Sequence, residues 1–246
     1  MNKRHIRISA LSYSNTFPFV YAMRHKLEGR VGELNYEVPA VSAQRFKNHE
    51  VDIALIPVAS LLEMSDYQII TDYCIGSYGE VKSVALFSKI PLESIRNIYL
   101  DTESRSSVNL VKILAKNSWK INPEWISLPE NSDALELDSV VLIGDKTFKY
   151  QNKFPYVYDL SLEWKKFTGL PFVFAVWVAR NSISNEIIDE LNQVFSYGLE
   201  RIPDLYNEFD ISISREEFEE YLNRYIDYNL DANKRKAIEL FISYLK

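Results

Sequence analysis

Short apolar runs of strand length alternate with segments of helical spacing through the first two thirds of this 246-residue chain. Residues 5–11 (HIRISAL) alternate like a strand, and residues 17–27 (FPFVYAMRHKL) have the spacing of a helix. Further strand-like runs lie at 34–41, 51–58, 67–75, 81–88, 97–101, 124–129, 139–145 and 156–161, and helix-like segments at 42–50, 60–64, 106–119 and 162–169. This alternation predicts βαβ units and a largely parallel sheet.

The most apolar strand-like run comes late, at residues 171–180 (PFVFAVWVAR), and the segment after it is helical in pattern. Ser214 and Glu217 form an S-x-x-E capping box, and Asp231 is placed to cap a last helix. No Gly/Ser-rich linker separates the two series of elements. We therefore expect two lobes joined by short crossings, with a ligand bound in the cleft where strands end.

Composition and spacing argue against several function classes. The formal net charge is −6 and no basic stripe stands out, which argues against nucleic-acid binding. The seven glycines form neither G-x-G-x-x-G nor a P-loop, so nicotinamide, flavin and nucleoside triphosphate chemistry lose their usual support. His5, His25 and His49 share no ligand spacing and Cys74 is the only cysteine, so neither a metal site nor a disulfide is expected. Without a signal-peptide or membrane-spanning apolar run, we expect a cytoplasmic protein.

Polar residues gather at the carboxyl ends of four predicted strands. The stretches are residues 12–18 (SYSNTFP), 75–83 (IGSYGEVKS), 100–107 (LDTESRSS) and 142–146 (LIGDK). Each alone is ordinary turn and cap chemistry. Their shared position at strand ends indicates one pocket.

The third stretch has the chemistry of an anion site. Thr102, Ser104, Ser106 and Ser107 supply hydroxyls at the start of a predicted helix, whose free N–H groups and dipole favour an anion. Arg105 is suited to a bidentate clamp on a carboxylate. A carboxylate-bearing small molecule is the sharper hypothesis, and an ordinary N-cap with Arg105 in water is the alternative.

No Ser–His–Asp set, activated cysteine or paired histidine is evident in the sequence. An enzyme of this kind has to work through hydrogen bonds, positioning and the substrate's own acid or base. Asn15 suits holding a substrate hydroxyl or carboxylate but is a poor general base.

Taken together, these stretches resemble the chorismate dehydratases of the futalosine route to menaquinone. The matching stretches run in family order from about residue 6 to residue 181: SYSNTFP, VDIALIP, GSYGEVKSVALFSKIPLESI, LDTESRSSVNLVKIL, VVLIGDK and YDLSLEWKKFTGLPFVFAVWVARN. The resemblance implies an α/β, two-lobe, type II periplasmic-binding-protein-like fold with the ligand cleft between the lobes. Lobe one would comprise residues 1–90 and 173–246, and residues 91–172 would form the inserted lobe two.

The resemblance also implies the activity of a carbon–oxygen lyase. Chorismate would lose water to give 3-[(1-carboxyvinyl)oxy]benzoate, with no cofactor. The implied partner is this small-molecule substrate, with neither nucleic acid nor membrane, in a monomer or homodimer.

Two residues of the matching motifs are implied to be catalytic. Asn15 matches the asparagine of the family's strand-end motif, and Ser83 matches the serine of its G-P-V-x-S motif. Because these motifs hold no strong base, we hypothesise that the enolpyruvyl carboxylate of the substrate takes the C3 proton. Asn15 would hold that conformer, and Ser83 would assist departure of the C4 hydroxyl.

Nine further residues are implied to bind the substrate. Thr102 to Ser107 match the family's T-S-R-T-S segment, and Arg105 is expected either to bind a carboxylate or to brace the loop. Asp145 either faces the cleft or caps a turn. Glu80 stands where the family has proline, which changes the turn before Ser83. The expected substrate-binding residues are Ser12, Ser77, Gly79, Thr102, Ser104, Arg105, Ser106, Ser107 and Asp145.

Two other functions remain open at this stage. One is the enzyme of the same pathway that opens cyclic dehypoxanthinyl futalosine, which typically carries S-P-C-P-N-D-T where this chain has SYSNTFP. The other is a non-catalytic cytoplasmic carboxylate-binding or sensor domain. Turnover of chorismate separates both from a dehydratase.

Overall fold

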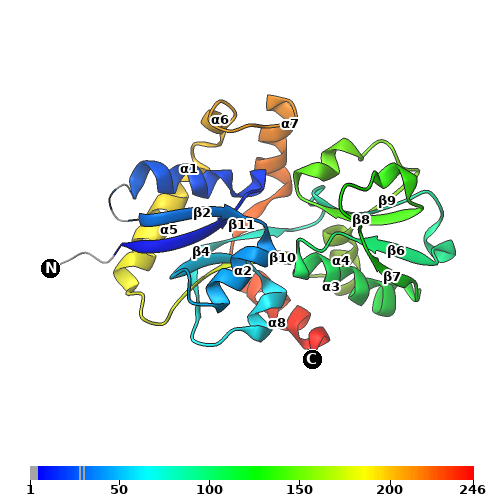
Figure 1. Ribbon diagram of the computed structural model, residues 1–246, viewed down its shortest axis with the longest axis horizontal. Coiled ribbons are helices and arrows are strands. Elements are labelled where there is room, and N and C mark those ends of the chain that lie inside the picture. The colour runs from blue at the N-terminus through cyan, green and yellow to red at the C-terminus, as the bar shows by residue number, and fades with distance from the viewer. Residues whose placement is uncertain (1–4, 28, 30) are drawn as a thin grey trace.

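The computed structural model describes residues 5–27, 29 and 31–246, which form two lobes side by side, each built on its own sheet (Figure 1). The six-stranded sheet has the order β11-β4-β10-β3-β1-β2, and the five-stranded sheet has the order β7-β6-β8-β5-β9. The first sheet contains β1 (Ile6–Leu11), β2 (Val31–Glu37), β3 (Ile53–Pro57), β4 (Gln68–Ser77), β10 (Phe172–Ala179) and β11 (Asp227–Asn229). The second contains β5 (Val84–Ser88), β6 (Asn97–Leu100), β7 (Glu124–Ser127), β8 (Ser139–Ile143) and β9 (Tyr156–Asp159).

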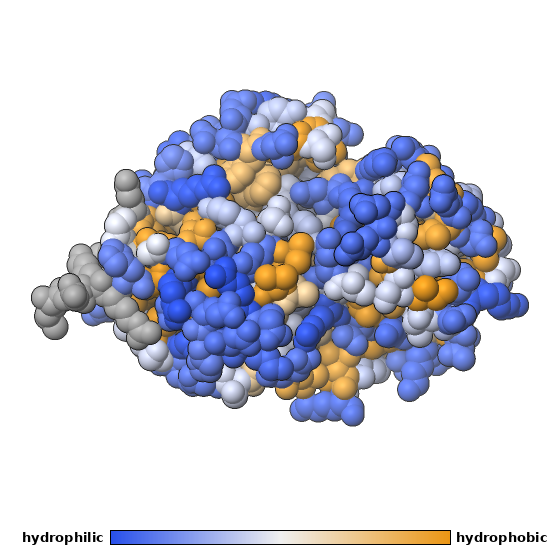
Figure 2. Space-filling view, viewed as in Figure 1, coloured by the Kyte–Doolittle hydropathy of each residue, from blue (hydrophilic) through white to orange (hydrophobic). Residues whose placement is uncertain are grey.

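Helices cover the faces of both sheets, and α7 lies over the junction between the lobes in the view of Figure 1. Figure 2 shows hydrophilic residues over most of the same face, with an apolar patch near its middle between the lobes. The helices are α1 (Phe17–Lys26), α2 (Pro39–Lys47), α3 (Arg105–Leu114), α4 (Leu160–Thr168), α5 (Asn185–Leu199), α6 (Ile202–Leu205), α7 (Arg215–Glu220) and α8 (Ala232–Leu245). Among the described residues, no helix is long and apolar enough to cross a membrane.

Both sheets are mixed, so the expectation of a largely parallel sheet is wrong. β1 runs parallel to β2 and β3, but β10 is antiparallel to both β3 and β4. The reason is that β10 returns from the second lobe and enters the first sheet against the direction of its neighbours. Its eight residues are all buried, which explains its apolar composition and its late position in the chain.

Two elements differ from the sequence-based expectation. The second strand covers Val31–Glu37 instead of 34–41, because Pro39 begins α2, a position that suits proline's fixed φ and missing N–H. The short strand β11, which pairs with the edge of β4, has no strand-like pattern in the sequence and was not expected.

The crossing into the second sheet comes earlier than the expected lobe boundary. β5, at Val84–Ser88, lies inside the range 1–90 but pairs with β8 and β9 of the second sheet. The return at β10 falls at residue 172. The division into 1–90 with 173–246 and 91–172 stays a prediction, and its residues 1–4, 28 and 30 lie outside the described part of the chain.

Aromatic packing fixes the lobes to their helices. Phe19 of α1 and Phe195 of α5 pack with Trp177 of β10, with Phe195 4.6 Å from Phe19 and 4.9 Å from Trp177 between ring centroids. On α8, Phe241 lies 6.0 Å from Trp164 of α4 and therefore ties the C-terminal helix to the chain that returns from the second lobe. The three pairs are tilted, stacked and edge-on, and each such pair adds about 0.5–1.5 kcal/mol beyond the burial of its area.

The predicted helix caps are confirmed. Ser214 and Glu217 form a reciprocal capping box at the start of α7, and Asp231 accepts from the Lys234 N–H at the start of α8. These N-caps fix where α7 and α8 begin, and this C-terminal segment supplies part of the site described next.

Candidate functional site

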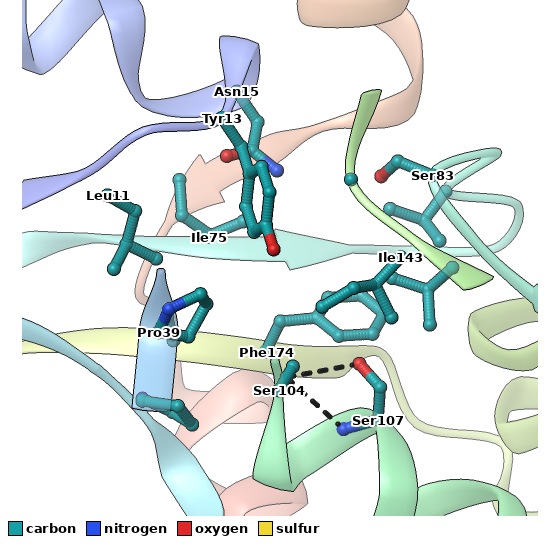
Figure 3. Close-up of a pocket in the computed structure, with 15 residues that line it drawn as sticks. Leu11, Tyr13, Asn15, Pro39, Ile75, Ser83, Ser104, Ser107, Ile143 and Phe174 are labelled. Atoms are coloured by element: carbon teal, nitrogen blue, oxygen red, sulfur yellow. Dashed lines mark hydrogen bonds between the residues drawn. The ribbon is translucent and has the colours of Figure 1, made fainter. Parts of the chain in front are cut away.

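A cavity lies between the two lobes and is lined by residues of both (Figure 3). Both sheets contribute to it at the ends of their strands, with Ile75 and Phe174 from the first and Val84 and Ile143 from the second. None of its described lining residues carries a charge. The lining consists of Leu11, Tyr13, Asn15, Pro39, Pro57, Ile75, Val81, Ser83, Val84, Ser104, Ser107, Ile143, Gly144, Phe174 and Ala175.

Asn15 and Ser83, the two residues expected to be catalytic, meet through a third side chain. Asn15 Nδ2 donates to the Tyr221 hydroxyl at 3.3 Å, and that hydroxyl donates to Ser83 Oγ at 2.7 Å. All three residues are buried. The Asn15 Oδ1 atom is also buried and has no hydrogen-bond partner among the described residues. Because buried acceptors are nearly always paired, this free oxygen indicates a ligand donor.

Ser83 stands on a strained turn. Its N–H bonds the carbonyl of Val81 at 2.7 Å, and the residue between them, Lys82, has a φ of 61°. A hydrogen bond between residues i and i+2 around a left-handed centre is the pattern of a rare γ-turn. Such strain persists only where neighbouring contacts hold it, and it is concentrated at functional sites.

Asp159 is the contact that holds this turn. Its Oδ2 accepts the N–H groups of Val81 at 2.9 Å and Lys82 at 2.7 Å, while its Oδ1 caps α4. Burial, opposed by these N–H bonds, raises the pKa of Asp159 to about 6. Ionised Asp159 makes stronger, charge-assisted bonds to the turn than the protonated form does.

We expect activity to fall as the pH drops through about 6, because Asp159 then takes up a proton and its hold on the Ser83 turn weakens. A pH profile of kcat measures this. The Asp159→Asn variant should be slower and lack that limb of the profile. Asp133→Asn, at a capping aspartate outside the cavity, should keep it. A wild-type profile that stays flat well below pH 6 would contradict this role.

The opposite wall of the cavity is the start of α3 (Figure 3). Ser104 is its N-cap and accepts from both the N–H and the hydroxyl of Ser107. The first N–H groups of a helix have no intrahelical partner, and its dipole favours negative charge there. With no charged side chain in the described lining, this helix end is the part of the cavity best suited to an anion.

Contacts between the lobes close the cavity. Asp145, at the end of β8, accepts from the N–H and hydroxyl of Ser14, and burial raises the pKa of its carboxyl. The Tyr13 hydroxyl donates to Glu103 at 2.6 Å, and Lys146 bonds the same Glu103 carboxylate at 2.9 Å. The Ser14–Asp145 and Tyr13–Glu103 bonds join the two lobes, and Lys146 holds Glu103 from within the second lobe.

Gly144 allows the lobes to approach this closely. It has a φ of 69°, and a Cβ built on it would lie 2.6 Å from the Tyr13 ring. Its N–H also bonds the carbonyl of Ser83 at 2.8 Å. A side chain at this position would strain the backbone and push the Tyr13 ring off the cavity wall.

We expect Gly144→Ala to lower kcat/KM by about tenfold or more, because it separates Tyr13 from the second lobe. The φ of 69° and ψ of −160° at Gly144 lie in a region that essentially only glycine adopts, so the substitution also costs about 1–3 kcal/mol of stability. Gly169→Ala is the control for a positive φ without a clash, since Gly169 has a φ of 76° but no atom within 4 Å of its built Cβ. It should lose less melting temperature than Gly144→Ala. Equal activity in the two would rule out a role for this contact in closure.

Four of the eleven predicted site residues line the cavity, namely Asn15, Ser83, Ser104 and Ser107. Arg105 instead pairs with Glu63 at 2.5 Å and so braces the start of α3, which was its alternative role. Ser106 bonds the backbone of Ala59 and Phe174 and ties α3 to the first lobe. The predicted residues that are not in the lining are Ser12, Ser77, Gly79, Thr102, Arg105, Ser106 and Asp145.

The remaining predicted residues contribute to the loops around the site. Ser77 bonds the carbonyls of Gly79 and Glu80 and closes the loop that leads to Ser83. Gly79 has a φ of 140° in that loop. Ser12 and Thr102 are exposed, and the Ser12 hydroxyl donates a hydrogen bond to the carbonyl of Glu37.

Tyr221 is the functional residue that sequence reasoning missed. In the sequence it follows Phe218 at a spacing of three, which is typical of a core-facing helix stripe, and it is 1% exposed. Its link to Ser83 spans 138 residues of sequence, so no local pattern signals it. Within residues 5–27, 29 and 31–246, no group of three or more His, Cys, Asp or Glu is placed to hold a metal ion.

Comparison with known sequences identifies a family and a relative. The family model described as menaquinone biosynthesis matches residues 6–246. A protein of Thermus thermophilus named chorismate dehydratase is 31% identical over an alignment of 214 positions, which covers 77% of this chain and 76% of that protein.

Solved structures show similar folds at low identity. A crystal structure of an Archaeoglobus fulgidus protein has a TM-score of 0.79 at 16% identity, covering 99% of this chain and 97% of that one. A Candida albicans protein described as having the generic periplasmic binding protein fold has a TM-score of 0.63 at 11% identity, covering 96% and 90%. These likenesses confirm the periplasmic-binding-protein-like fold class expected from the sequence.

Proposed function

The chain belongs to the menaquinone biosynthesis family and, within it, to the chorismate dehydratases, and from this premise we propose that it is a cytoplasmic lyase that dehydrates chorismate to 3-[(1-carboxyvinyl)oxy]benzoate. The observation that carries the proposal is the interlobe cavity, in which Asn15 and Ser83 face the start of α3.

The lining of the cavity suits the parts of chorismate. Ile75, Ile143 and Phe174 offer apolar surface to the ring. The start of α3 at Ser104 supplies N–H groups and a positive dipole end for a carboxylate.

The reaction is an elimination across C3 and C4 of the ring. The C3 proton passes to the enolpyruvyl carboxylate of the substrate, the C3–H electron pair forms the C3–C4 double bond, and the C4–oxygen bond breaks. The departing hydroxide and one proton leave as water, and the ring becomes aromatic. Ser83 donates a hydrogen bond to the departing oxygen, where negative charge develops.

Asn15 acts on the carboxylate that takes the proton. Its free Oδ1 is an acceptor, and an acceptor favours the protonated form of a facing carboxyl group. The carboxylate therefore becomes more basic where Asn15 holds it. Among the described lining residues, none is a carboxylate, histidine or lysine that would serve as a protein base.

A mass-spectrometric assay with both candidate substrates tests the proposal. Purified protein is incubated with chorismate or with cyclic dehypoxanthinyl futalosine, without an added cofactor. We expect chorismate to give a species lighter by one water, above the spontaneous background, and the second compound to stay intact. Turnover of the futalosine compound alone would replace this proposal with the ring-opening enzyme, and binding of chorismate without turnover would replace it with a sensor.

A further inference from the structure

We propose that Tyr221 is a positioning residue for this reaction, whose phenol keeps Ser83 turned as a hydrogen-bond donor toward the cavity. The inference rests on the proposed dehydratase function and extends the site to the C-terminal segment of the chain.

The direction of the hydrogen-bond chain follows from counting protons. Tyr221 has one phenolic proton and two polar neighbours, Asn15 Nδ2 at 3.3 Å and Ser83 Oγ at 2.7 Å. An amide nitrogen can only donate, so the Tyr221 oxygen accepts from Asn15 and the phenolic proton goes to Ser83.

This order decides what Ser83 can do. Its Oγ already accepts one hydrogen bond from Tyr221, and its own proton remains available to a group in the cavity. Hydrogen bonds in series polarise one another, so the Ser83 hydroxyl becomes a stronger donor to a departing hydroxide. Without the phenol, the hydroxyl is free to rotate away from that direction.

Burial and ring packing hold the Tyr221 side chain in one position. It is 1% exposed, and its ring packs edge-on against Phe148 of the second lobe, with centroids 4.9 Å apart. It is not among the residues that line the cavity, so it acts through Ser83. Burial raises the pKa of Tyr221, and the phenol stays protonated through the neutral range.

The backbone at Tyr221 is also unusual. Residues Tyr221–Tyr225 form a π turn directly after α7, a feature that occurs frequently at functional sites. The same segment brings in Tyr228, whose hydroxyl donates to the carbonyl of Asn15 at 2.9 Å. Tyr228 thus fixes the backbone of Asn15, whereas Tyr221 sets the orientation of the reacting hydroxyl.

A double-mutant cycle tests the inference. Tyr221→Phe keeps the ring and removes only the hydroxyl, and we expect it to lower kcat for chorismate about 10- to 100-fold with little change in KM. In the Ser83→Ala background the same substitution should cost less than about threefold, because the hydroxyl it positions is gone. A residue that only supports the fold would cost the same factor in both backgrounds.

Tyr150→Phe is the matched control, since Tyr150 is also buried and its hydroxyl bonds Asp133 away from the cavity. It should keep near-wild-type kcat. Wild-type protein that does not turn over chorismate would overturn the proposed function and this inference with it. Active wild-type protein, with Tyr221→Phe equal to it or with equal losses in the two backgrounds, would overturn the inference alone.

Discussion

Replacing Ser83 by alanine is expected to lower kcat for chorismate dehydration about 10²- to 10³-fold, the usual effect of removing one donor to a developing oxyanion. Ser83 is 1% exposed, lines the cavity and is held by the γ-turn and by Tyr221. Because the donor acts where charge develops, KM should change little. Steady-state kinetics on purified, folded variants measure both parameters.

Ser88→Ala is the control for this variant. Ser88 is a fully buried serine on β5, and its hydroxyl bonds the carbonyl of Ile90 outside the cavity. It should lose some stability and keep its activity. Ser83→Ala with wild-type kcat, or with a loss confined to KM, would remove Ser83 from the chemical step.

Replacing Asn15 by alanine is expected to lower kcat by a similar factor, about 10²- to 10³-fold. Here the loss has two causes. The variant loses the buried Oδ1 acceptor, and it loses the Nδ2 donor that orients the Tyr221 hydroxyl. The same kinetic measurement applies, with a thermal melt to show that the variant is folded.

Asn117→Ala offers the comparison, since the Asn117 side chain bonds the carbonyl of Ile113 in the second lobe. Its kcat should match the wild type. If folded Asn15→Ala turns over chorismate normally, the enolpyruvyl carboxylate does not depend on this amide, and the assigned role fails.

Sequence patterns predicted those parts of the site whose structure is decided by residues close together in the chain. Ser104 was found because an N-cap is decided within a few residues of its helix, and Asn15 and Ser83 were found because they belong to matching motifs at strand ends. The apolar run 171–180 likewise predicted the buried strand β10, although not its antiparallel direction. That direction depends on how the chain returns from the second lobe.

Residues whose roles depend on distant partners were harder to predict. Arg105 had two expected roles, binding a substrate carboxylate or bracing the loop, because its partner Glu63 lies 42 positions away in sequence. The sequence is compatible with two roles for Asp145, because its partner Ser14 lies 131 positions away. Tyr221 has the sequence pattern of a core residue, and its hydrogen-bond partners are also distant in sequence. A sequence shows which groups are available, and tertiary packing decides which of them already have a partner.

The most direct test of the account uses chorismate carrying deuterium at C3, followed by mass spectrometry in a time course with the wild-type protein. We expect a product lighter by one HDO. It should form more slowly than the product of unlabelled chorismate, because the bond between C3 and its hydrogen breaks in the elimination. Product that keeps its deuterium, or no product above the spontaneous background, would contradict the elimination across C3 and C4 that we assign to this cavity.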